Sequence, residues 1–360
     1  MEWDWYWICS IPGIYRRDIQ YLLQHFGTAG AVRNASVKEL TEIPFLKTEQ
    51  KNSLVYQKMH FSVEEEYHRC KRAGIRFVSF EEDSYPKKLL QIEDYPYGLY
   101  VKGELPQEEQ RCIAIVGARM CTNYGRQMAQ ILSARLAEHQ VAVISGMAYG
   151  IDGISHGTSL EHGGKSYGVL GSGVDICYPR EHYELYHQMI KCGGVLSEYP
   201  MGTRALPSHF PQRNRIISGM ADIIVVVEAK KKSGSLITAD LALDQGRDVY
   251  VFPGRVGDPL SEGCNRLIAQ GAGVISDIDS FLSEIGIADV KMKKKKKTNN
   301  VLATAENMVY SCVDSQTRSL QNISDALNMP VSQVISALGS LQMKGLVLET
   351  AKNHYTRNIS

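Results

Sequence analysis

The sequence predicts an α/β protein built around a doubly wound, mostly parallel sheet, and three observations lead to this fold class. Short apolar runs rich in valine and isoleucine recur through residues 76–286, as expected of strands that are buried on both faces. Helical patterns separate these runs, and strands that alternate with helices form right-handed crossovers in a parallel sheet. Glycine-rich segments follow the runs, and open α/β sheets bind their ligands at the carboxyl ends of the strands.

Each element of this central region follows from the spacing of its apolar residues. Met128, Ile131, Leu132 and Leu136 recur at helical spacing, which places them on one face of a helix over 124–138. The strands are expected where the apolar runs are short and continuous, at Cys112–Val116, Val141–Ser145, Tyr167–Leu170, Gly194–Ser197, Asp222–Val227, Asp248–Phe252 and Gly273–Ile275.

Residues 1–70 predict a small helical domain ahead of the sheet. Leu22, Leu23 and Phe26 lie at helical spacing, and Gly27 suits the end of that helix. Further helices are expected in the segments SVKELTEI and KTEQKNSLVYQKMH. The segments IPGI and FGTAGAV resemble helix-hairpin-helix modules, which hold DNA phosphates on backbone amides. The alternative is a helical packing domain that binds no ligand.

Residues 301–360 predict a winged-helix domain. A helix, an Asn-Met-Pro turn and a second helix at Val331–Met343 are followed by the strand LVLET, whose hairpin partner is expected at His354–Arg357. Such modules often bind DNA. The second helix carries only Lys344 at its end, so contact with a protein or a spacer role is equally open. The apolar faces of this domain are expected from Ile323, Leu327, Val334, Leu338 and Leu341.

Composition limits the classes of protein to which the chain can belong. Apolar residues make up 44% of the chain and charged residues 22%, proportions typical of a soluble globular protein. No apolar run reaches the roughly 18–20 residues of a membrane span, and the N-terminus lacks the basic start of a signal peptide. A cytoplasmic location is therefore expected. The eight cysteines form no C-x-x-C pair, so neither a zinc or redox site nor a cofactor is expected.

Charge is distributed unevenly along the chain. The net charge of +1 by itself gives no reason to expect a nucleic-acid partner. Residues 201–232, however, hold a local excess of arginine and lysine that suits a polyanion. The lysine-rich stretch at 287–300 predicts an exposed linker, because its like charges repel one another, and it could add non-specific attraction to phosphates.

The turn after Cys112–Val116 departs from a dinucleotide-binding turn. A G-x-G-x-x-G turn needs its second glycine so that the backbone can approach a pyrophosphate. Here Arg119 takes the place of the second glycine and Thr122 the place of the third. We therefore interpret Arg119 as a cation at a strand end that faces a polynucleotide backbone. The segment Ser233-Gly234-Ser235, ahead of an expected helix, adds a serine cap and free backbone N–H groups for phosphate.

The stretch FPQRNRIISGMAD at 210–222 carries the most functional information. Phe210 offers a ring for stacking, and the guanidinium groups of Arg213 and Arg215 suit phosphates and base faces. An aromatic residue beside arginines and a glycine-rich sheet edge is what single-stranded nucleic acid would need. The alternative is structural: Asn214 and Arg215 would cap neighbouring helices, and Phe210 would fill the core. The residue chemistry alone leaves both interpretations open.

Asp152 and His156 are four residues apart and would share a helix face. One interpretation is an acid–base or metal-binding pair. The other is a structural pair whose polar atoms are satisfied, since no third ligand is evident. The pattern GISHG at 153–157 matches a nucleophile elbow by its letters, but Ser155 lies about ten residues beyond a strand end, whereas an elbow serine lies directly at one.

Seven motifs occur in the order and spacing of one known family. They are IVGARMCTNYGR, VISGMAYGIDGISHG, VLGSGVDICYP, GGVLSEYPMG, FPQRNRIISGMAD, VVVEAKKKSGSLITADLALDQGRDVYVFPG and EGCNRLIAQGA, which together span about residues 110–275. The chain thereby resembles the DNA-processing protein A family (DprA, also called Smf). The resemblance implies an extended Rossmann-like domain, preceded by a sterile-alpha-motif-like helical domain and followed in some members by a winged helix.

The same resemblance implies a function without catalytic turnover. Family members bind and protect incoming single-stranded DNA during natural transformation. They then load the RecA recombinase onto DNA covered by single-strand-binding protein, and the resemblance suggests a homodimer formed through the Rossmann-like domains. We therefore expect single-stranded DNA, RecA recombinase and single-strand-binding protein as partners, and no membrane span.

The resemblance also assigns a candidate DNA-binding site. Arg119 would contact the DNA backbone, and Tyr183 would stack on a base. Where the family often has Tyr-Pro-Lys, this chain has Tyr178-Pro179-Arg180, which keeps the charge but changes the shape of the side chain. We expect that replacing Arg119 and Arg215 together by alanine severely weakens DNA binding and leaves the fold intact. The expected site comprises Gly117, Ala118, Arg119, Ser145, Gly146, Gly171, Ser172, Arg180, Tyr183, Phe210, Arg213, Asn214, Arg215, Ser233, Gly234, Ser235 and Thr238.

An enzyme is the second hypothesis. Related Rossmann-like folds include lysine-decarboxylase-like phosphoribohydrolases, which cleave nucleotides and carry the motif P-G-G-x-G-T-x-x-E. Their glutamate performs the acid–base work. Here Thr238 is followed by Ala239, Asp240 and Leu241, so no glutamate stands in that window.

Overall fold

The computed structural model describes residues 2–287, 304–314 and 317–358. The linker expected at 287–300 lies outside the described residues, apart from Ile287. In the part of the chain that the structure describes, none of the helices combines the length and the apolar character needed to cross a membrane.

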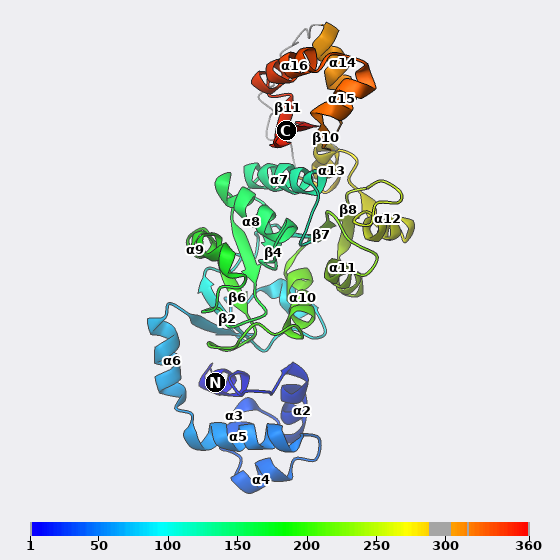
Figure 1. Ribbon diagram of the computed structural model, residues 1–360. Helices are drawn as coiled ribbons and strands as arrows, with labels where there is room; N and C mark the ends of the chain where they lie inside the picture. The colour runs from blue at the N-terminus through cyan, green and yellow to red at the C-terminus, as the bar shows by residue number, and fades with distance from the viewer. Residues whose placement is uncertain (1, 288–303, 315–316, 359–360) are drawn as a thin grey trace. The chain divides into compact units, whose positions relative to one another are not determined.

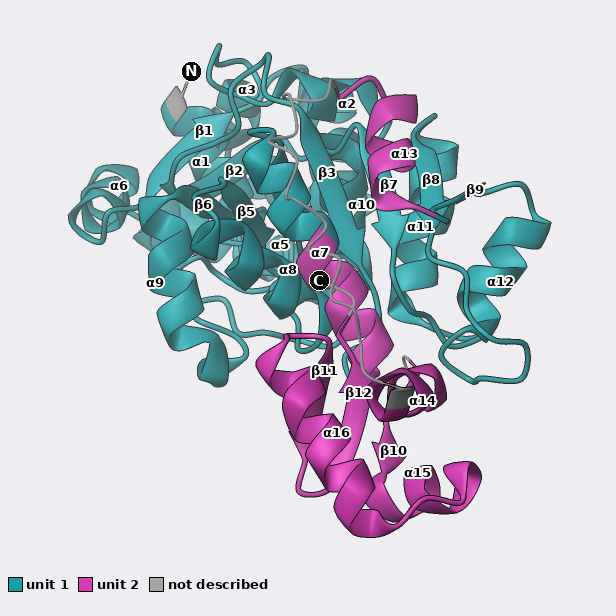
Figure 2. Ribbon diagram, turned by 90° about the horizontal axis from the view of Figure 1, so that it is seen from above, with its two compact units in different colours: residues 1–120, 132–276 teal, residues 121–131, 277–360 magenta. Residues whose placement is uncertain are grey.

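The chain divides into two compact units, shown in different colours in Figure 2. The larger unit comprises residues 1–120 and 132–276, and the smaller one comprises 121–131 and 277–360. The larger unit thus holds both the N-terminal helices and the main sheet, and the domain boundaries expected from the sequence stay predictions.

A nine-stranded sheet forms the centre of the larger unit, in the order β1-β2-β6-β5-β4-β3-β7-β8-β9. The strands from β3 to β9 run parallel, and helices cover both faces of the sheet (Figure 1). This confirms the predicted doubly wound α/β fold. The parallel strands are β3 (Cys112–Val116), β4 (Ala142–Ser145), β5 (Ser166–Val169), β6 (Gly193–Ser197), β7 (Ile223–Val226), β8 (Asp248–Val251) and β9 (Gly273–Val274).

Two further strands lie at the β6 edge of the sheet. β1 (Arg76–Ser79) pairs with β2 (Gly98–Gly103), and β2 pairs with β6, both antiparallel. The sequence interpretation assigned strands only from residue 112 onward, so it missed this edge.

The parallel strands reverse their order at β3. The chain passes from β3 to β4, β5 and β6 on one side, whereas β7, β8 and β9 lie on the other side. Ala114 in β3 pairs with Ile144 in β4 and with Ile224 in β7, and all three residues are fully buried. Sheets of this kind bind ligands in the crevice where the connections from two neighbouring parallel strands go to opposite sides of the strand order. Here those two strands are β3 and β7, so the site is expected at their carboxyl ends.

The helices that follow β3 connect the parallel strands. α8 packs against β3, β4 and β5, and α10 packs against the same strands and against α11. The predicted helix over 124–138 is confirmed as α7. The helices that follow β3 are α7 (Asn123–Glu138), α8 (Ile151–Glu161), α9 (Tyr183–Lys191), α10 (His209–Met220), α11 (Gly234–Asp244) and α12 (Glu262–Ala269), with short 3-10 turns η1 (Lys87–Gln91) and η2 (Arg180–His182).

The N-terminal helices pack on the antiparallel edge of the sheet. In α1, the Tyr6 ring lies 5.2 Å from the Phe77 ring of β1, centroid to centroid, and the Trp5 ring lies 5.4 Å from that of Tyr97. Gly27 ends α2 at a φ of 90°, as its position suggested. The helices are α1 (Glu2–Cys9), α2 (Arg16–Phe26), α3 (Ala29–Asn34), α4 (Val37–Glu42), α5 (Thr48–His60) and α6 (Val63–Arg72).

The smaller unit contains the order of elements of a winged helix. In the described residues, a three-stranded sheet in the order β10-β12-β11 accompanies the helices α14, α15 and α16, and α13 precedes them. Ile323, Val334, Leu338 and Leu341 are buried in its core, and Leu327 packs against them, as the apolar pattern predicted. The elements are α13 (Ile278–Glu284), α14 (Thr304–Cys312), β10 (Arg318–Ser319), α15 (Leu320–Leu327), α16 (Val331–Met343), β11 (Val347–Ala351) and β12 (His354–Arg357).

Candidate functional site

A cleft of about 500 Å³ lies where the sheet reverses its strand order. Its wall is formed by the residues that follow β3, the loop after β4, the first turns of α10 and the start of α11. The cleft brings together nine of the residues predicted from the sequence. They are Gly117, Arg119, Phe210, Arg213, Asn214, Ser233, Gly234, Ser235 and Thr238.

Close packing against α8 fixes the turn that carries Arg119. A Cβ atom on Gly117 would lie 2.7 Å from Cγ1 of Ile151, and one on Gly150 would lie 2.3 Å from the carbonyl oxygen of Ala118. The backbone N–H of Ile151 donates to that same oxygen at 3.2 Å. Ala118 is buried, whereas Arg119 is exposed. The glycines therefore set a tight turn that leaves one cation at the mouth of the cleft.

Phe210, in the first turn of α10, is the aromatic centre of the cleft. The guanidinium carbons of Arg119 and Arg213 lie 5.8 Å and 5.9 Å from its ring centroid. The Tyr178 ring lies 5.6 Å away at an angle of 33°. Phe210 is only partly buried, so it does not fill the core as the structural alternative supposed. Its ring is placed as a stacking surface with cations beside it.

Arg213 is a buried arginine that joins two strand ends. Its Nη1 donates to the carbonyl oxygen of Gly146 at 2.9 Å and to that of Val169. A Cβ atom on Gly146 would lie 2.5 Å from Nη2, so the guanidinium needs a glycine there. Burial lowers the pKa of Arg213 to about 10, with Asp152 opposing that shift. Because Nη1 is used by the backbone after β4 and at the end of β5, Arg213 supports the cleft wall that carries Phe210, and its contact with DNA stays a prediction.

The start of α11 forms the opposite wall. Ser233 caps the helix, its hydroxyl accepting from the backbone N–H of Ser235 at 3.4 Å. Asn214 donates from Nδ2 to the carbonyl oxygen of Gly234 at 3.3 Å, which ties α10 to this cap. The N-terminus of a helix attracts anions through its free N–H groups and its dipole, and Lys232 adds an exposed cation beside it.

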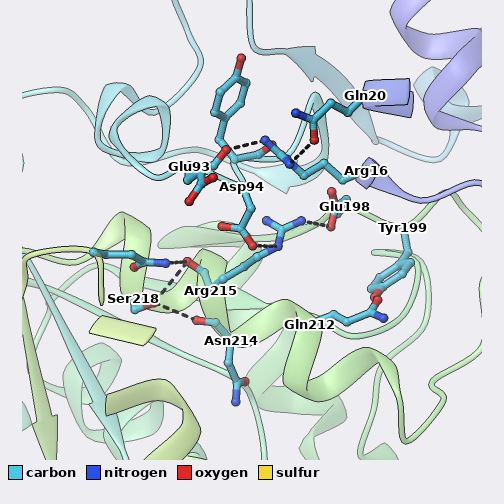
Figure 3. A network of polar contacts seen from close by, with 12 residues as sticks. Arg16, Gln20, Glu93, Asp94, Glu198, Tyr199, Gln212, Asn214, Arg215 and Ser218 are labelled. Carbon is cyan, nitrogen blue, oxygen red and sulfur yellow. Dashed lines mark hydrogen bonds and ion pairs between the residues drawn. The ribbon is translucent and has the colours of Figure 1, made fainter. Parts of the chain in front are cut away.

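Arg215 is placed differently from Arg119. Its side chain is 8% exposed, and it is not among the residues that line the cleft. Nη2 pairs with Glu198 at 2.6 Å and Nε with Asp94 at 3.2 Å (Figure 3). Burial alone would lower the pKa of Arg215, but the two carboxylates outweigh it and the pKa is raised. Its removal would leave Glu198 without its cation, so we expect a cost in stability. That the fold survives the loss of Arg215, and that Arg215 contacts DNA, both stay predictions.

Four other predicted residues lie beneath the site and do not line the cleft. Ser145 is fully buried and donates to the carbonyl oxygen of Ile115 at 2.6 Å, and the buried Ser172 donates to that of Ile176 at 3.3 Å. Gly146 lies against Arg213. Gly171 supports the start of α10, since a Cβ atom there would lie 3.0 Å from the Phe210 ring. Hydroxyls engaged in this way hold the fold, and contact of these four residues with DNA stays a prediction.

Arg180 and Tyr183 are exposed but lie outside the cleft wall, in η2 and at the start of α9. The sequence interpretation gave no role of their own to Tyr178 and Lys232, which do line the cleft. The sequence could have indicated Lys232, because the run Lys230–Lys232 directly precedes the helix cap Ser233-Gly234-Ser235. The indication for Tyr178 is weaker, since it is only an aromatic residue directly before Pro179.

The structure resolves the alternatives for Asp152 and His156. Asp152 accepts from the backbone N–H groups of Gly146 at 3.1 Å and Ala148 at 3.4 Å, which shapes the loop after β4. Nδ1 of His156 donates to the Ser166 hydroxyl at 2.7 Å, and burial lowers the pKa of His156 to about 3. Asp152 and Nδ1 of His156 thus have structural partners, whereas the buried Nε2 of His156 has no hydrogen-bond partner among the described residues. Across residues 2–287, 304–314 and 317–358, no three His, Cys, Asp or Glu side chains are grouped as a metal site would require.

The fold and the cleft define a Rossmann-like protein. Where such a fold would have a dinucleotide-binding turn, the cleft has Arg119, the Phe210 ring and the N-terminus of α11. The chain belongs to the DNA recombination-mediator protein A family, whose family model matches residues 76–286. This match confirms the resemblance that the motifs indicated, to a family of DNA recombination mediators.

Named relatives and solved structures agree with this membership. The chain is 37% identical to DNA processing protein DprA of Streptococcus pneumoniae, over 65% of this chain and 83% of that protein. It is 33% identical to Protein Smf of Escherichia coli, over 75% and 74% of the two chains. The X-ray structure of the Streptococcus pneumoniae protein superimposes with a TM-score of 0.67 and 30% identity, covering 79% of this chain and 98% of that one.

A second solved structure describes how DNA processing protein A from Helicobacter pylori binds single-stranded DNA. It superimposes with a TM-score of 0.53 and 27% identity, and covers 58% of this chain and 95% of that one.

Proposed function

We propose that this chain binds single-stranded DNA in the cleft at the strand-order reversal and acts there as a recombination mediator without catalytic turnover. The observation that carries the proposal is the Phe210 ring, with Arg119 at 5.8 Å and the capped start of α11 on the opposite wall of the same cleft. A base can stack on the ring, for roughly 1–3 kcal/mol, while the cation and the helix N-terminus hold the adjoining phosphates. The single-stranded DNA binding of the Helicobacter pylori relative supports this assignment.

The finer role follows from family membership. In this proposal the protein protects incoming single strands during natural transformation and loads RecA recombinase onto DNA covered by single-strand-binding protein. It would do so in the cytoplasm as a homodimer. The support comes from the motif resemblance and from the relatives named as DNA processing proteins in Streptococcus pneumoniae and Bacillus subtilis.

The cleft wall also supports a binding role over an enzymatic one. Among the described residues that line the cleft, Asp152 is the single carboxylate, and two backbone N–H groups hold it. A phosphoribohydrolase needs a free carboxylate for acid–base work at the sugar. Incubation with nucleoside monophosphates should therefore release no free base, and base release by the pure protein would favour the enzyme.

A gel-shift comparison of single- and double-stranded oligonucleotides, with and without ATP, tests the binding role. We expect preferential binding of the single strand without ATP, and an affinity that falls with salt at a slope of about −0.7 for each phosphate contacted. Equal binding of the duplex, or no binding at low salt, would contradict the proposal. RecA loading is tested separately, by following RecA filament formation on strands covered by single-strand-binding protein with and without this chain.

A further inference from the structure

Exposed aromatic side chains continue from the cleft across the neighbouring surface of the larger unit. Tyr178 is 49% exposed, Tyr149 is 42% exposed and Tyr183 is 61% exposed. They come from the loop after β4 and from the segment that leads into α9. Large aromatic side chains are usually withdrawn from water, so three exposed rings in one region point to a binding surface.

Ring contacts link this surface to the cleft. The Tyr178 ring lies 5.6 Å from Phe210, the Tyr149 ring lies 5.5 Å from that of His182, and Tyr183 follows His182 directly in the chain. Tyr178 is also a residue of the cleft wall. The aromatic surface thus begins at the proposed base-stacking residue and extends over η2 to the start of α9.

His182 and Tyr149 are held in place before any ligand arrives. Nδ1 of His182 donates to the carbonyl oxygen of Met147 at 3.0 Å, and its ring packs so closely on α8 that a Cβ atom on Gly153 would lie 2.5 Å from Cε1. The hydroxyl of Tyr149 donates to Glu181. A preformed aromatic surface loses little conformational freedom when a base stacks on it, which favours binding.

The charges beside these rings favour bases over phosphates. Arg180 supplies an exposed cation, but Glu181 and Glu184 in the same stretch are exposed carboxylates. Two carboxylates against one arginine repel a chain of phosphates more than they attract it. Contact with a strand would therefore come from the base faces, which are uncharged and which stack on any aromatic ring whatever the sequence.

We infer that Tyr178, Tyr149 and Tyr183 form a stacking track that carries the DNA strand out of the cleft and over η2 toward α9. This inference rests on the proposed function and extends its binding site to tyrosines on the surface beside the cleft. The track lengthens the bound segment by stacking, without adding phosphate contacts.

Fluorescence anisotropy with two oligothymidylates tests the track, one of about 5 nucleotides that the cleft alone can hold and one of about 20. For the wild type we expect tighter binding of the long strand. The Tyr149→Ala, Tyr183→Ala double variant should bind the long strand about fivefold or more weakly than the wild type and the short strand equally well. Tyr149→Phe and Tyr183→Phe keep the rings and should bind the long strand clearly more tightly than the double alanine variant does.

Tyr56→Ala is the matched control, because Tyr56 is an exposed tyrosine on α5 that is absent from the cleft wall. It should bind both strands like the wild type. Long strands with an abasic 5′ or 3′ half separate stacking from phosphate contact: one of the two should lose the gain in affinity, and that half identifies the end that follows the track.

Three results would overturn the track. They are unchanged long-strand affinity in the double alanine variant, equal affinity for abasic and complete strands, and a long-strand loss as large in Tyr56→Ala. In each case short-strand binding in the cleft would still stand. If the wild type binds neither strand, the proposed function itself fails. If the double variant binds DNA normally but loses a protein partner, the tyrosines form a protein contact and the track is wrong.

Discussion

Arg119 and Arg215 belong to two motifs of similar appearance, yet the fold uses them in opposite ways. Arg119 follows a buried strand by three residues and is exposed beside Phe210. Arg215 lies in α10 with both Glu198 and Asp94 on its guanidinium. Arg119 is exposed and can contact a ligand, whereas Arg215 is already paired with two carboxylates. We therefore expect a basic motif to bind a phosphate chain only where the fold leaves its cation without a carboxylate partner, as it does for Arg119 within the described part of the chain.

The largest effect is expected from the buried arginine. Arg215→Ala leaves the half-buried Glu198 without its cation, and breaking a buried ion pair costs on the order of 3 kcal/mol. Urea unfolding should show a lower midpoint with an unchanged slope. Arg204→Ala is the control, since Arg204 is an exposed arginine of the loop before α10. If the midpoint is unchanged and DNA binding is lost, Arg215 contacts DNA, and the distinction between a binding Arg119 and a structural Arg215 is wrong.

Phe210 should give the largest effect on binding with little effect on stability. Phe210→Ala removes the stacking face and should weaken single-strand binding by about 2 kcal/mol, roughly 30-fold, with an unchanged salt slope. Phe210→Trp keeps an aromatic face and should retain most of the affinity. Fluorescence anisotropy at several salt concentrations measures both quantities. A change in salt slope without loss of affinity would show that the ring only positions the neighbouring cations.

Arg119 should affect the salt dependence more than the affinity. Arg119→Ala should weaken binding about tenfold at low salt and reduce the salt slope by about 0.7 for each phosphate lost. The free energy of unfolding should stay within about 0.5 kcal/mol of the wild type, because Arg119 is exposed. Arg119→Lys should restore the slope and only part of the affinity, since a lysine cannot bind phosphate in a bidentate manner. If the lysine variant restores neither, Arg119 does not contact phosphate.

Much of the fold could be predicted because its strands are buried on both faces. Runs such as Cys112–Val116 consist almost entirely of apolar residues, which indicates burial on both faces. The positions of these strands were therefore predicted within a residue or so. The helix α1 was missed for the opposite reason. Trp5, Tyr6, Trp7 and Ile8 are all buried, so the segment has no polar face and no helical period. Its environment comes in part from the edge strands β1 and β2, which the sequence interpretation also missed.

The site was predictable only in part, for a related reason. The exposure of Arg119 follows from local features, a strand end and a tight glycine turn. The burial of Arg215 depends on Asp94 and Glu198, which come from distant segments of the chain, and spacing within one motif carries no information about such partners. The same limit applies to Tyr149, whose proximity to the cleft depends on how the loop after β4 folds against α8.

The smallest effect is expected from Ser233, which both lines the cleft and stabilises the fold as a helix cap. Its hydroxyl caps α11, while Ser233, Gly234 and Ser235 also line the cleft. Ser233→Ala should cost about 1 kcal/mol of unfolding free energy, whereas Ser233→Gly, which suits a cap position, should cost only a few tenths. Both variants keep the backbone donors, so DNA affinity measured on the folded proteins should change little. Equal stability of the two variants would show that the cap contributes nothing, and a large loss of affinity in both would make the hydroxyl itself a DNA contact.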